Sequence, residues 1–92
     1  MSVCAKKAIV RNALGIHARP AALVVKEASK YSAGVYLSTE MAQRINGKSI
    51  MGVMMLAAEN GAEVLVEAEG DDAQEAVDAL TALLESDFEG AA

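Results

Sequence analysis

Gly15, His17, Arg19 and Pro20 form a short segment whose residue types and spacing could support chemistry. His17 is the only histidine of the chain, and an apolar helical pattern begins directly after it. Proline is tolerated in the first turn of a helix because the N–H group that it lacks would have no intrahelical partner there. We therefore predict that His17 lies at a helix N-terminus, where free N–H groups and the helix dipole attract an anion.

This arrangement suits a histidine that takes on a phosphoryl group and gives it up again. An imidazole has an unperturbed pKa of about 6.5, and the positive helix end and Arg19 both disfavour its protonation. The Arg19 guanidinium also has donors arranged for phosphate oxygens, and Gly15 allows a close backbone approach. A structural interpretation remains beside this one, in which His17 is a solvated cap residue, Arg19 a solvated side chain and Pro20 a simple helix start.

A helix over residues 18–30 must position His17. Its apolar side chains recur at helical spacing and form one stripe, which consists of Ala21, Val24, Val25, Ala28 and Tyr31. Leu23 falls off that stripe, so we expect it to be exposed close to His17.

The remaining elements complete two layers. Strands are predicted within residues 3–11, 35–38, 42–45 and 63–69, and Val64, Val66 and Ala68 of the last strand face inward. A final helix begins after a cap at Asp71 or Asp72, and its apolar face comprises Ala73, Ala76, Val77, Leu80, Leu83 and Leu84. Amphipathic helices and a sheet with one apolar face bury each other, so the predicted fold class is an α+β open-faced sandwich.

Ser49 is a good N-cap residue for a short helix over 50–55. The run that follows it is more continuously apolar than a short surface helix requires. Helical spacing divides this run into two sets, with Ile50, Val53 and Leu56 expected mainly in the core and Met51, Met54 and Met55 on an overlapping face.

Length and composition indicate one soluble domain over residues 1–92, with a frayed tail at 89–92. Only 3% of the 92 residues are aromatic, so the core must consist of alanine, valine, leucine, isoleucine and methionine. The single cysteine, Cys4, cannot form an internal disulfide, and a single histidine cannot assemble a zinc cluster. Because the sequence shows neither a secretory signal nor an apolar run long enough to span a bilayer, we expect a cytoplasmic monomer that does not insert into membranes.

The charge distribution divides the chain at Ser49. All eight basic residues precede it and meet two acids, which gives +6, whereas eleven acids and no basic residue follow, which gives −11. The net charge of −5 argues against a nucleic-acid partner. If His17 lies near Arg44 and Lys48, its surroundings are basic and would steer an acidic partner toward it, although the asymmetry could also represent two solvated faces.

Two segments carry a resemblance to a known family. Residues 12–22, Asn-Ala-Leu-Gly-Ile-His-Ala-Arg-Pro-Ala-Ala, resemble the active-site segment of the HPr family, the histidine-containing phosphocarrier proteins of the bacterial phosphotransferase system. Residues 46–56, Asn-Gly-Lys-Ser-Ile-Met-Gly-Val-Met-Met-Leu, resemble the regulatory-serine segment of that family. The likeness extends from about Ala8 to Leu84.

The resemblance implies a four-stranded antiparallel sheet in the order 1-4-2-3 with three helices on one face. It implies that His17 accepts a phosphoryl group at Nδ1 from enzyme I, which phosphoenolpyruvate charges, and passes it to a histidine of an enzyme IIA protein. Arg19 would neutralise the charge of the phosphate, and Pro20 would fix the helix start. Ala18 stands where some members have threonine, so backbone donors must do more. The family needs no metal or cofactor for this transfer.

The resemblance also implies regulation and docking. Ser49 matches the serine that a bifunctional HPr kinase/phosphorylase modifies, and Met51 and Met54 match residues of a docking surface beside the histidine. Leu23, Lys48 and Ile50 complete the expected partner-binding set. Methionine suits such a surface, since its unbranched thioether adapts to partners of different shape. Two other functions stay open, namely a purely regulatory relative that acts through Ser49 and a binding module in which His17 is incidental.

Overall fold

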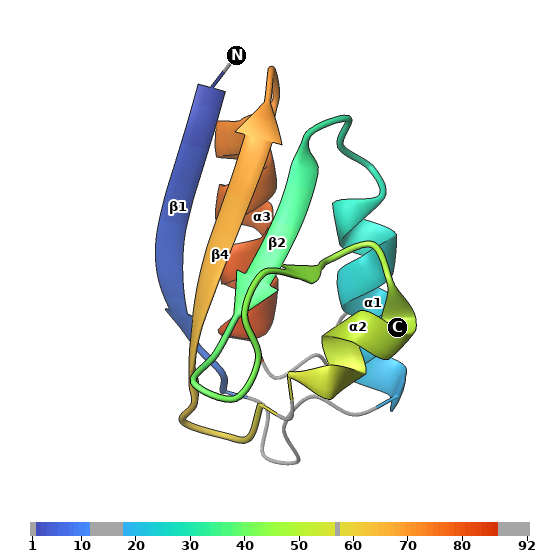
Figure 1. Cartoon of the computed structure of the whole chain (residues 1–92), viewed down its shortest axis with the longest axis vertical. Coiled ribbons are helices and arrows are strands. Elements are labelled where there is room, and N and C mark those ends of the chain that lie inside the picture. Colours follow the sequence, from blue (N-terminus) through green and yellow to red (C-terminus); the bar gives the residue numbers. More distant parts are fainter. Residues whose placement is uncertain (1, 12–17, 57, 87–92) are drawn as a thin grey trace.

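The structure is a computed structural model that describes residues 2–11, 18–56 and 58–86. Within these ranges, four strands form one antiparallel sheet in the order β1-β4-β2-β3 (Figure 1), as the resemblance implies. The strands are β1 (Ser2–Ile9), β2 (Gly34–Ser38), β3 (Ile45–Asn46) and β4 (Glu63–Gly70). The helices are α1 (Ala18–Ala28), α2 (Ile50–Met55) and α3 (Ala73–Leu84). The predicted α+β open-faced sandwich is confirmed.

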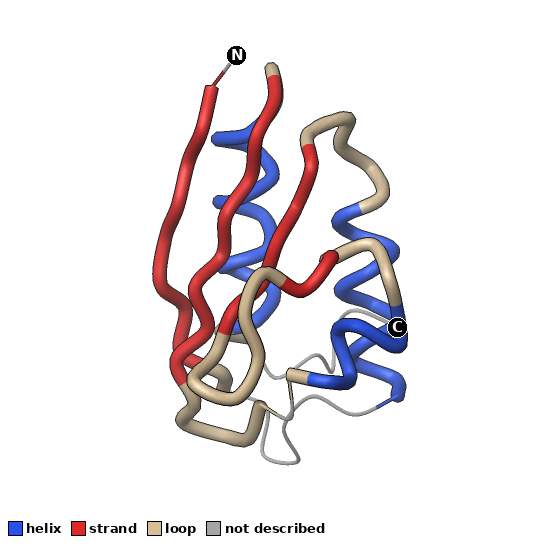
Figure 2. Tube along the Cα trace, in the orientation of Figure 1, coloured by secondary structure: helices blue, strands red, loops and turns tan. Residues whose placement is uncertain are grey.

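The strand register aligns the buried side chains of neighbouring strands on the same face of the sheet. β4 lies between β1 and β2, where Ala68 is paired with Cys4 on one side and Val35 on the other. Successive side chains of a strand point to opposite faces, so the buried Val64, Val66 and Ala68 face the helices as predicted. Figure 2 shows α3 behind the strands, α1 and α2 together at the side of β2, and the other face of the sheet open.

The core is built from small and medium-sized side chains. Apart from Pro20, the buried apolar residues in the described ranges are alanine, valine and leucine only. The prediction that methionine shares this core is wrong for the residues described, and isoleucine contributes only through Ile45, which is half-buried and packs against the core. Ile50 is 45% exposed. An α-helix needs 3.6 residues for a full turn, so side chains spaced three residues apart drift around the axis, and Ile50 and Leu56 lie about 120° apart. A helix of six residues cannot turn both sides inward, and Val53 and Leu56 take the buried positions.

The third strand is shorter than the predicted segment 42–45. Thr39 Oγ1 accepts hydrogen bonds from the N–H groups of Met41 (3.2 Å) and Ala42 (3.3 Å), which folds the chain into a loop after β2. Arg44 then adopts a φ of 47°, in the left-handed region. Extended pairing therefore begins only at Ile45.

Asp72 occupies the N-cap position of α3 but makes no side-chain cap hydrogen bond. Its carboxylate instead accepts the N–H groups of Ser32 (2.9 Å) and Ala33 (2.8 Å), and also the Ser32 hydroxyl (3.3 Å). The Ser32 N–H, followed by that of Ala33, holds the pKa of Asp72 below its ordinary value. The predicted cap residue thus connects the loop before β2 to the start of α3.

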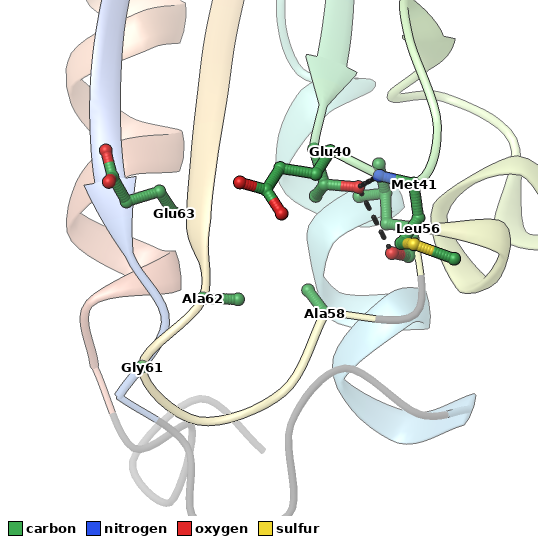
Figure 3. A pocket seen from close by; sticks show the side chains of 8 residues that line it. Glu40, Met41, Leu56, Ala58, Gly61, Ala62 and Glu63 are labelled. Carbon is green, nitrogen blue, oxygen red and sulfur yellow. Dashed lines mark hydrogen bonds between the residues drawn. The ribbon is translucent and has the colours of Figure 1, made fainter.

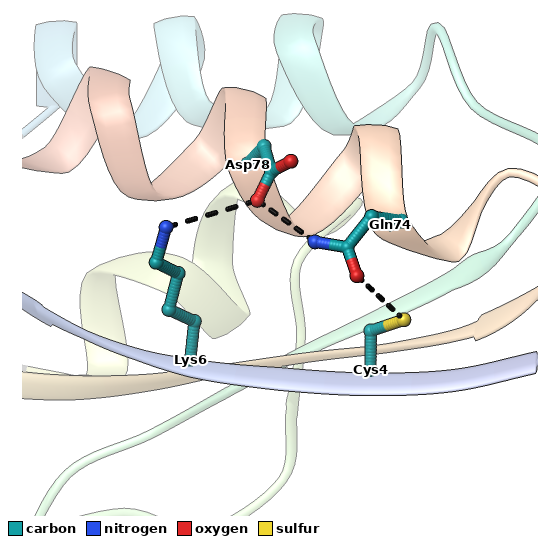
Figure 4. A network of polar contacts seen from close by, with 4 residues as sticks. All are labelled: Cys4, Lys6, Gln74 and Asp78. Atoms are coloured by element: carbon teal, nitrogen blue, oxygen red, sulfur yellow. Dashed lines mark hydrogen bonds and ion pairs between the residues drawn. The ribbon is translucent and has the colours of Figure 1, made fainter.

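Side chains of β1 reach α3 through a small polar network (Figure 4). Cys4 Sγ donates to Gln74 Oε1 at 3.4 Å, and Gln74 Nε2 donates to Asp78 Oδ1 at 2.9 Å. Lys6 Nζ lies 3.8 Å from the same Asp78 oxygen. Because Lys6 and Asp78 are more than half exposed, this ion pair contributes about 0–1 kcal/mol.

Candidate functional site

Described residues hold the chain on both sides of segment 12–17. That segment, with Gly15 and His17, lies outside the described residues. On its N-terminal side, the N–H of Val10 donates to the Ala62 carbonyl at 2.9 Å and that of Arg11 to the Leu84 carbonyl at 3.2 Å. Hydrogen bonds to the start of β4 and the end of α3 thus fix the chain as it enters the segment.

α1 holds the chain on the other side. The helix begins at Ala18, the residue after His17, so Pro20 lies in its first turn, as predicted. Arg19 is exposed and Pro20 is buried, while the Ala18 side chain lies outside the described residues. No acidic residue stands in the first turn, so no carboxylate there offsets the positive end of the helix dipole.

Arg19 and Lys26 give α1 a positively charged outer face. The two residues are seven positions apart, which places them on the same side of the helix two turns apart. Both are exposed, and neither forms an ion pair with any carboxylate in the described ranges. This face can attract an anion or an acidic protein surface.

Arg44 does not add to that positive face. Its guanidinium lies 4.2 Å from the ring centroid of Tyr36 and forms ion pairs with Glu67 (3.6 Å) and Glu69 (3.7 Å). These three partners alternate with the buried residues of β2 and β4, so Arg44 lies on the open face of the sheet, opposite the helices. The expectation that Arg44 helps to form basic surroundings at the start of α1 is therefore wrong.

Lys48 lies near the other end of α1. Its Nζ donates to the carbonyl of Tyr31 at 2.8 Å, three residues beyond the last residue of the helix. An 11-residue helix is about 16 Å long, so the ammonium group is separated from Ala18 by most of that length. The sequence grouped Lys48 with the start of α1, and the structure does not.

Ser49 caps α2 as predicted. Its Oγ accepts the N–H of Gly52 at 3.1 Å, and its own backbone is extended. A Cβ atom at Gly52 would lie 2.9 Å from Ile45 Cγ2 and 3.3 Å from Ser49 Oγ. Glycine is therefore needed for α2 to approach β3 this closely.

α2 presents an apolar outer surface of Ile50, Met51, Met54 and Met55, which we call the α2 surface. Met51, Met54 and Met55 are exposed on this face, as helical spacing predicted, and Met55 lies one helical turn after Met51. Leu23 is half-buried and packs against the core rather than being exposed. It lies three positions after the buried Pro20, which makes the two side chains neighbours on the helix surface.

A hollow of about 320 Å³ lies between the loop after β2 and the start of β4 (Figure 3). The carboxylates of Glu40 and Glu63 border it, and the Thr39 hydroxyl donates to the Leu56 carbonyl at 3.4 Å. Two carboxylates repel phosphate, so this hollow is unsuited to phosphoryl transfer. The sequence gives no signal for it, because its residues come from two separate loops.

No helix in the described part of the chain is both long enough and apolar enough to span a bilayer.

Comparisons with known proteins agree with this geometry. A family model described as the PTS HPr component phosphorylation site matches residues 4–86. The HPr-like protein Crh of Bacillus subtilis is 43% identical over 82 residues, which cover 89% of this chain and 95% of that protein.

Solved structures show the same fold. The phosphocarrier protein HPr from Bacillus anthracis superposes with a TM-score of 0.86 at 38% identity and covers 92% of this chain and 100% of its own. An HPr dimer from Thermoanaerobacter tengcongensis gives a TM-score of 0.71 at 47% identity, covering 86% of this chain and 90% of its own. The chain described here therefore belongs to the HPr family of the phosphotransferase system.

Proposed function

We propose that this protein is a phosphocarrier that accepts a phosphoryl group on His17 from phosphorylated enzyme I and passes it to a histidine of an enzyme IIA protein. The observation that carries this proposal is the start of α1. The helix begins directly after His17, its first turn contains no acid, and Arg19 is exposed with no ion pair to any carboxylate that the structure describes. A carrier is consumed and regenerated stoichiometrically, so the protein is not itself an enzyme.

The chemistry follows from these groups. The neutral imidazole attacks phosphorus, the bond between phosphorus and the enzyme I histidine breaks, and the phosphoryl group remains on His17 until the reverse step at enzyme IIA. Backbone N–H groups in the first turn of α1 and the Arg19 guanidinium stabilise the phosphate oxygens. Because Ala18 offers no hydroxyl, backbone donors must do more of the stabilisation, and the modest stabilisation keeps the phosphoryl group easy to surrender. Neither metal nor cofactor takes part.

Partner docking uses two neighbouring surfaces. Arg19 and Lys26 on α1 attract an acidic partner, and the α2 surface supplies apolar contact. Figure 1 shows α2 beside α1, so both surfaces can face one partner at a time. Leu23, Ile50, Met51 and Met54 contribute contact area, while Lys48 contributes charge at the far end of α1.

Phosphorylation of Ser49 by an HPr kinase/phosphorylase regulates this docking. The Ser49 hydroxyl accepts the Gly52 N–H at 3.1 Å and is half-buried. A phosphate there adds about −1.5 to −2 charges beside the α2 surface, which disfavours a partner built for apolar contact or for cations.

A purely regulatory role through Ser49 is the second candidate. The similarity to the HPr-like protein Crh supports it as well as it supports the family. The presence of His17 favours the carrier, because a regulator of this kind does not need a phosphorylatable histidine.

We also propose a monomer in the cytoplasm. β1 is an edge strand with Lys6 and Lys7 at its centre, and charged side chains on an edge oppose pairing with a second copy. Because a solved relative is a dimer, light scattering across a range of protein concentrations tests this point. A mass that doubles with concentration would contradict it.

Incubation with enzyme I and phosphoenolpyruvate tests the carrier. We expect one acid-labile phosphoryl group by intact-mass spectrometry, present in Ser49→Ala and absent in His17→Ala. Phosphate that is acid-stable and confined to Ser49 after incubation with a kinase and ATP, with no transfer from enzyme I, would favour the regulator.

A further inference from the structure

Methionine has an unusual distribution in this protein. All four methionines in the described ranges are exposed, Met41 by 81%, Met51 by 77%, Met54 by 43% and Met55 by 65%. Buried methionine is common in proteins because its flexible thioether fills irregular gaps. Here the buried apolar residues other than Pro20 are alanine, valine and leucine, so no described thioether contributes to the core.

Three of these four residues lie on α2, where they form most of the α2 surface. Met51 is separated from Met54 and Met55 by three and four positions, so the three thioethers are neighbours on the helix. The inward positions of the same segment are Val53 and Leu56, which carry no sulfur. Solvent therefore reaches the sulfur side of α2 while the packing side contains only hydrocarbon.

From this arrangement we propose that the α2 surface is a reversible oxidation switch, in which a peroxide converts Met51 and Met55, and then Met54, to methionine sulfoxide and thereby weakens docking to enzyme I. The inference rests on the proposed phosphocarrier function. The order follows the exposed fractions of the three side chains.

The chemistry is balanced with hydrogen peroxide as the oxidant. The thioether sulfur attacks one peroxide oxygen, an S–O bond forms, the O–O bond breaks, and water leaves. Sulfur loses two electrons and the peroxide gains them. A sulfoxide reductase reverses the change with electrons from thiols.

The consequence is confined to the surface. A sulfoxide turns an apolar side chain into a polar one, and an interface that buries it without a donor must leave that oxygen unpaired. This predicts a rise of roughly fivefold to a hundredfold in the KM of enzyme I for this protein, which corresponds to one buried unpaired polar group. The fold should not change, because the affected side chains lie outside the core.

The test uses the full chain in a Cys4→Ser background, which removes the half-buried thiol as a competing target. Hydrogen peroxide is applied, fragmentation mass spectrometry locates each sulfoxide, and the KM of enzyme I is measured before oxidation, after it, and after sulfoxide reductase. The variant M51L/M54L/M55L should keep its KM under peroxide. Met41→Leu is the matched control, since it removes an equally exposed sulfur outside α2, and it should remain sensitive.

The outcomes separate the two proposals. A higher KM after oxidation, with an unchanged urea-unfolding curve and recovery after the reductase, supports the switch. Sulfoxides on α2 with an unchanged KM, sensitivity that persists in the triple variant, or unfolding of the oxidised protein overturns it. If enzyme I does not phosphorylate the untreated protein, the phosphocarrier function itself is wrong and the switch is lost with it.

Discussion

Arg19 is the residue on which phosphoryl transfer should depend most after His17. Arg19→Gln keeps a polar side chain but removes the permanent charge, and we expect kcat/KM for transfer to fall by roughly tenfold to a hundredfold. Rapid-quench assays with enzyme I measure it. Lys26→Gln is the matched control, because it removes one charge from the same face two turns away. It should change KM without lowering kcat, and equal losses of kcat in both variants would contradict a direct role for Arg19.

Thr81 offers a test of stability at the same scale. Its side-chain oxygen is buried and has no hydrogen-bond partner among the residues that the structure describes. Thr81→Val replaces the hydroxyl by a methyl group of similar size, so the free energy of unfolding should rise by about 1 kcal/mol. Urea denaturation at constant m-value measures the change.

Thr39→Val is the matched control for Thr81→Val, and it should change the free energy of unfolding in the opposite direction. The Thr39 hydroxyl donates to the Leu56 carbonyl and accepts two backbone N–H groups. Its removal should lower the free energy of unfolding by about 1–2 kcal/mol. Stabilisation by both valine substitutions would mean that these polar contacts do not operate in solution.

At the scale of elements, the carboxylate of Asp72 connects α3 to the loop before β2. Its pKa is lowered in the folded protein, chiefly by the Ser32 N–H, so folding favours the ionised form. The stabilisation is present above the unfolded-state pKa of about 3.9 and is lost as the pH falls through the lower folded-state pKa. The free energy of unfolding of the wild type should therefore fall between neutral pH and acid, and this fall should be smaller in Asp72→Asn.

Asp71→Asn is the control for this pH dependence, because Asp71 is the exposed neighbour of Asp72 and its carboxylate accepts no hydrogen bond from the described residues of the loop before β2. Asp72→Asn should also destabilise the protein at pH 7, since an amide presents one acceptor oxygen to two N–H groups. Identical acid dependence in the wild type and Asp72→Asn would show that this carboxylate does not connect the two elements.

The elements that hydrophobic spacing defines could be predicted from the sequence. β4 and the buried face of α3 follow from periodicity, because each buries a regular set of side chains. The start of α2 follows instead from its cap residue, Ser49. The path of the chain around Arg44 could not be predicted, since it depends on the Thr39 loop and a positive φ. The hydrogen bond between Asp72 and Ser32 could not be predicted either. Ser32 lies forty residues away in the sequence, and the local pattern around Asp72 indicates a helix cap instead.

At the scale of the molecule, the strong charge asymmetry of the sequence is only partly preserved on the surface. Arg44 lies between acids on the open sheet face, whereas Arg19 and Lys26 on α1 form no ion pair within residues 2–11, 18–56 and 58–86. Charge counting cannot separate these cases, because pairing depends on which strands become neighbours. The structure therefore places Arg19 in the first turn of α1, Arg44 on the open face of the sheet and Lys48 near the opposite end of α1. The role of Arg19 in phosphoryl transfer stays a prediction.

This distribution predicts how association with enzyme I depends on salt. The association rate should fall as ionic strength rises, because salt screens the attraction between exposed charges. Lys26→Gln should lower the rate at low salt and flatten its dependence, whereas Arg44→Gln should leave both unchanged because the Arg44 charge is compensated on the other face. Stopped-flow measurements at several salt concentrations provide the comparison. Equal effects of the two substitutions would contradict this assignment of charges.

The central claim is that His17 carries a phosphoryl group and gives it up. Its most direct test is a chase: the protein is phosphorylated by enzyme I, separated from it, and mixed with an enzyme IIA protein in a rapid-quench apparatus. We predict that phosphate leaves His17 as it arrives on enzyme IIA, with one phosphoryl group transferred per group lost. Phosphate that stays on this protein, or that is released to water without reaching enzyme IIA, would contradict the account.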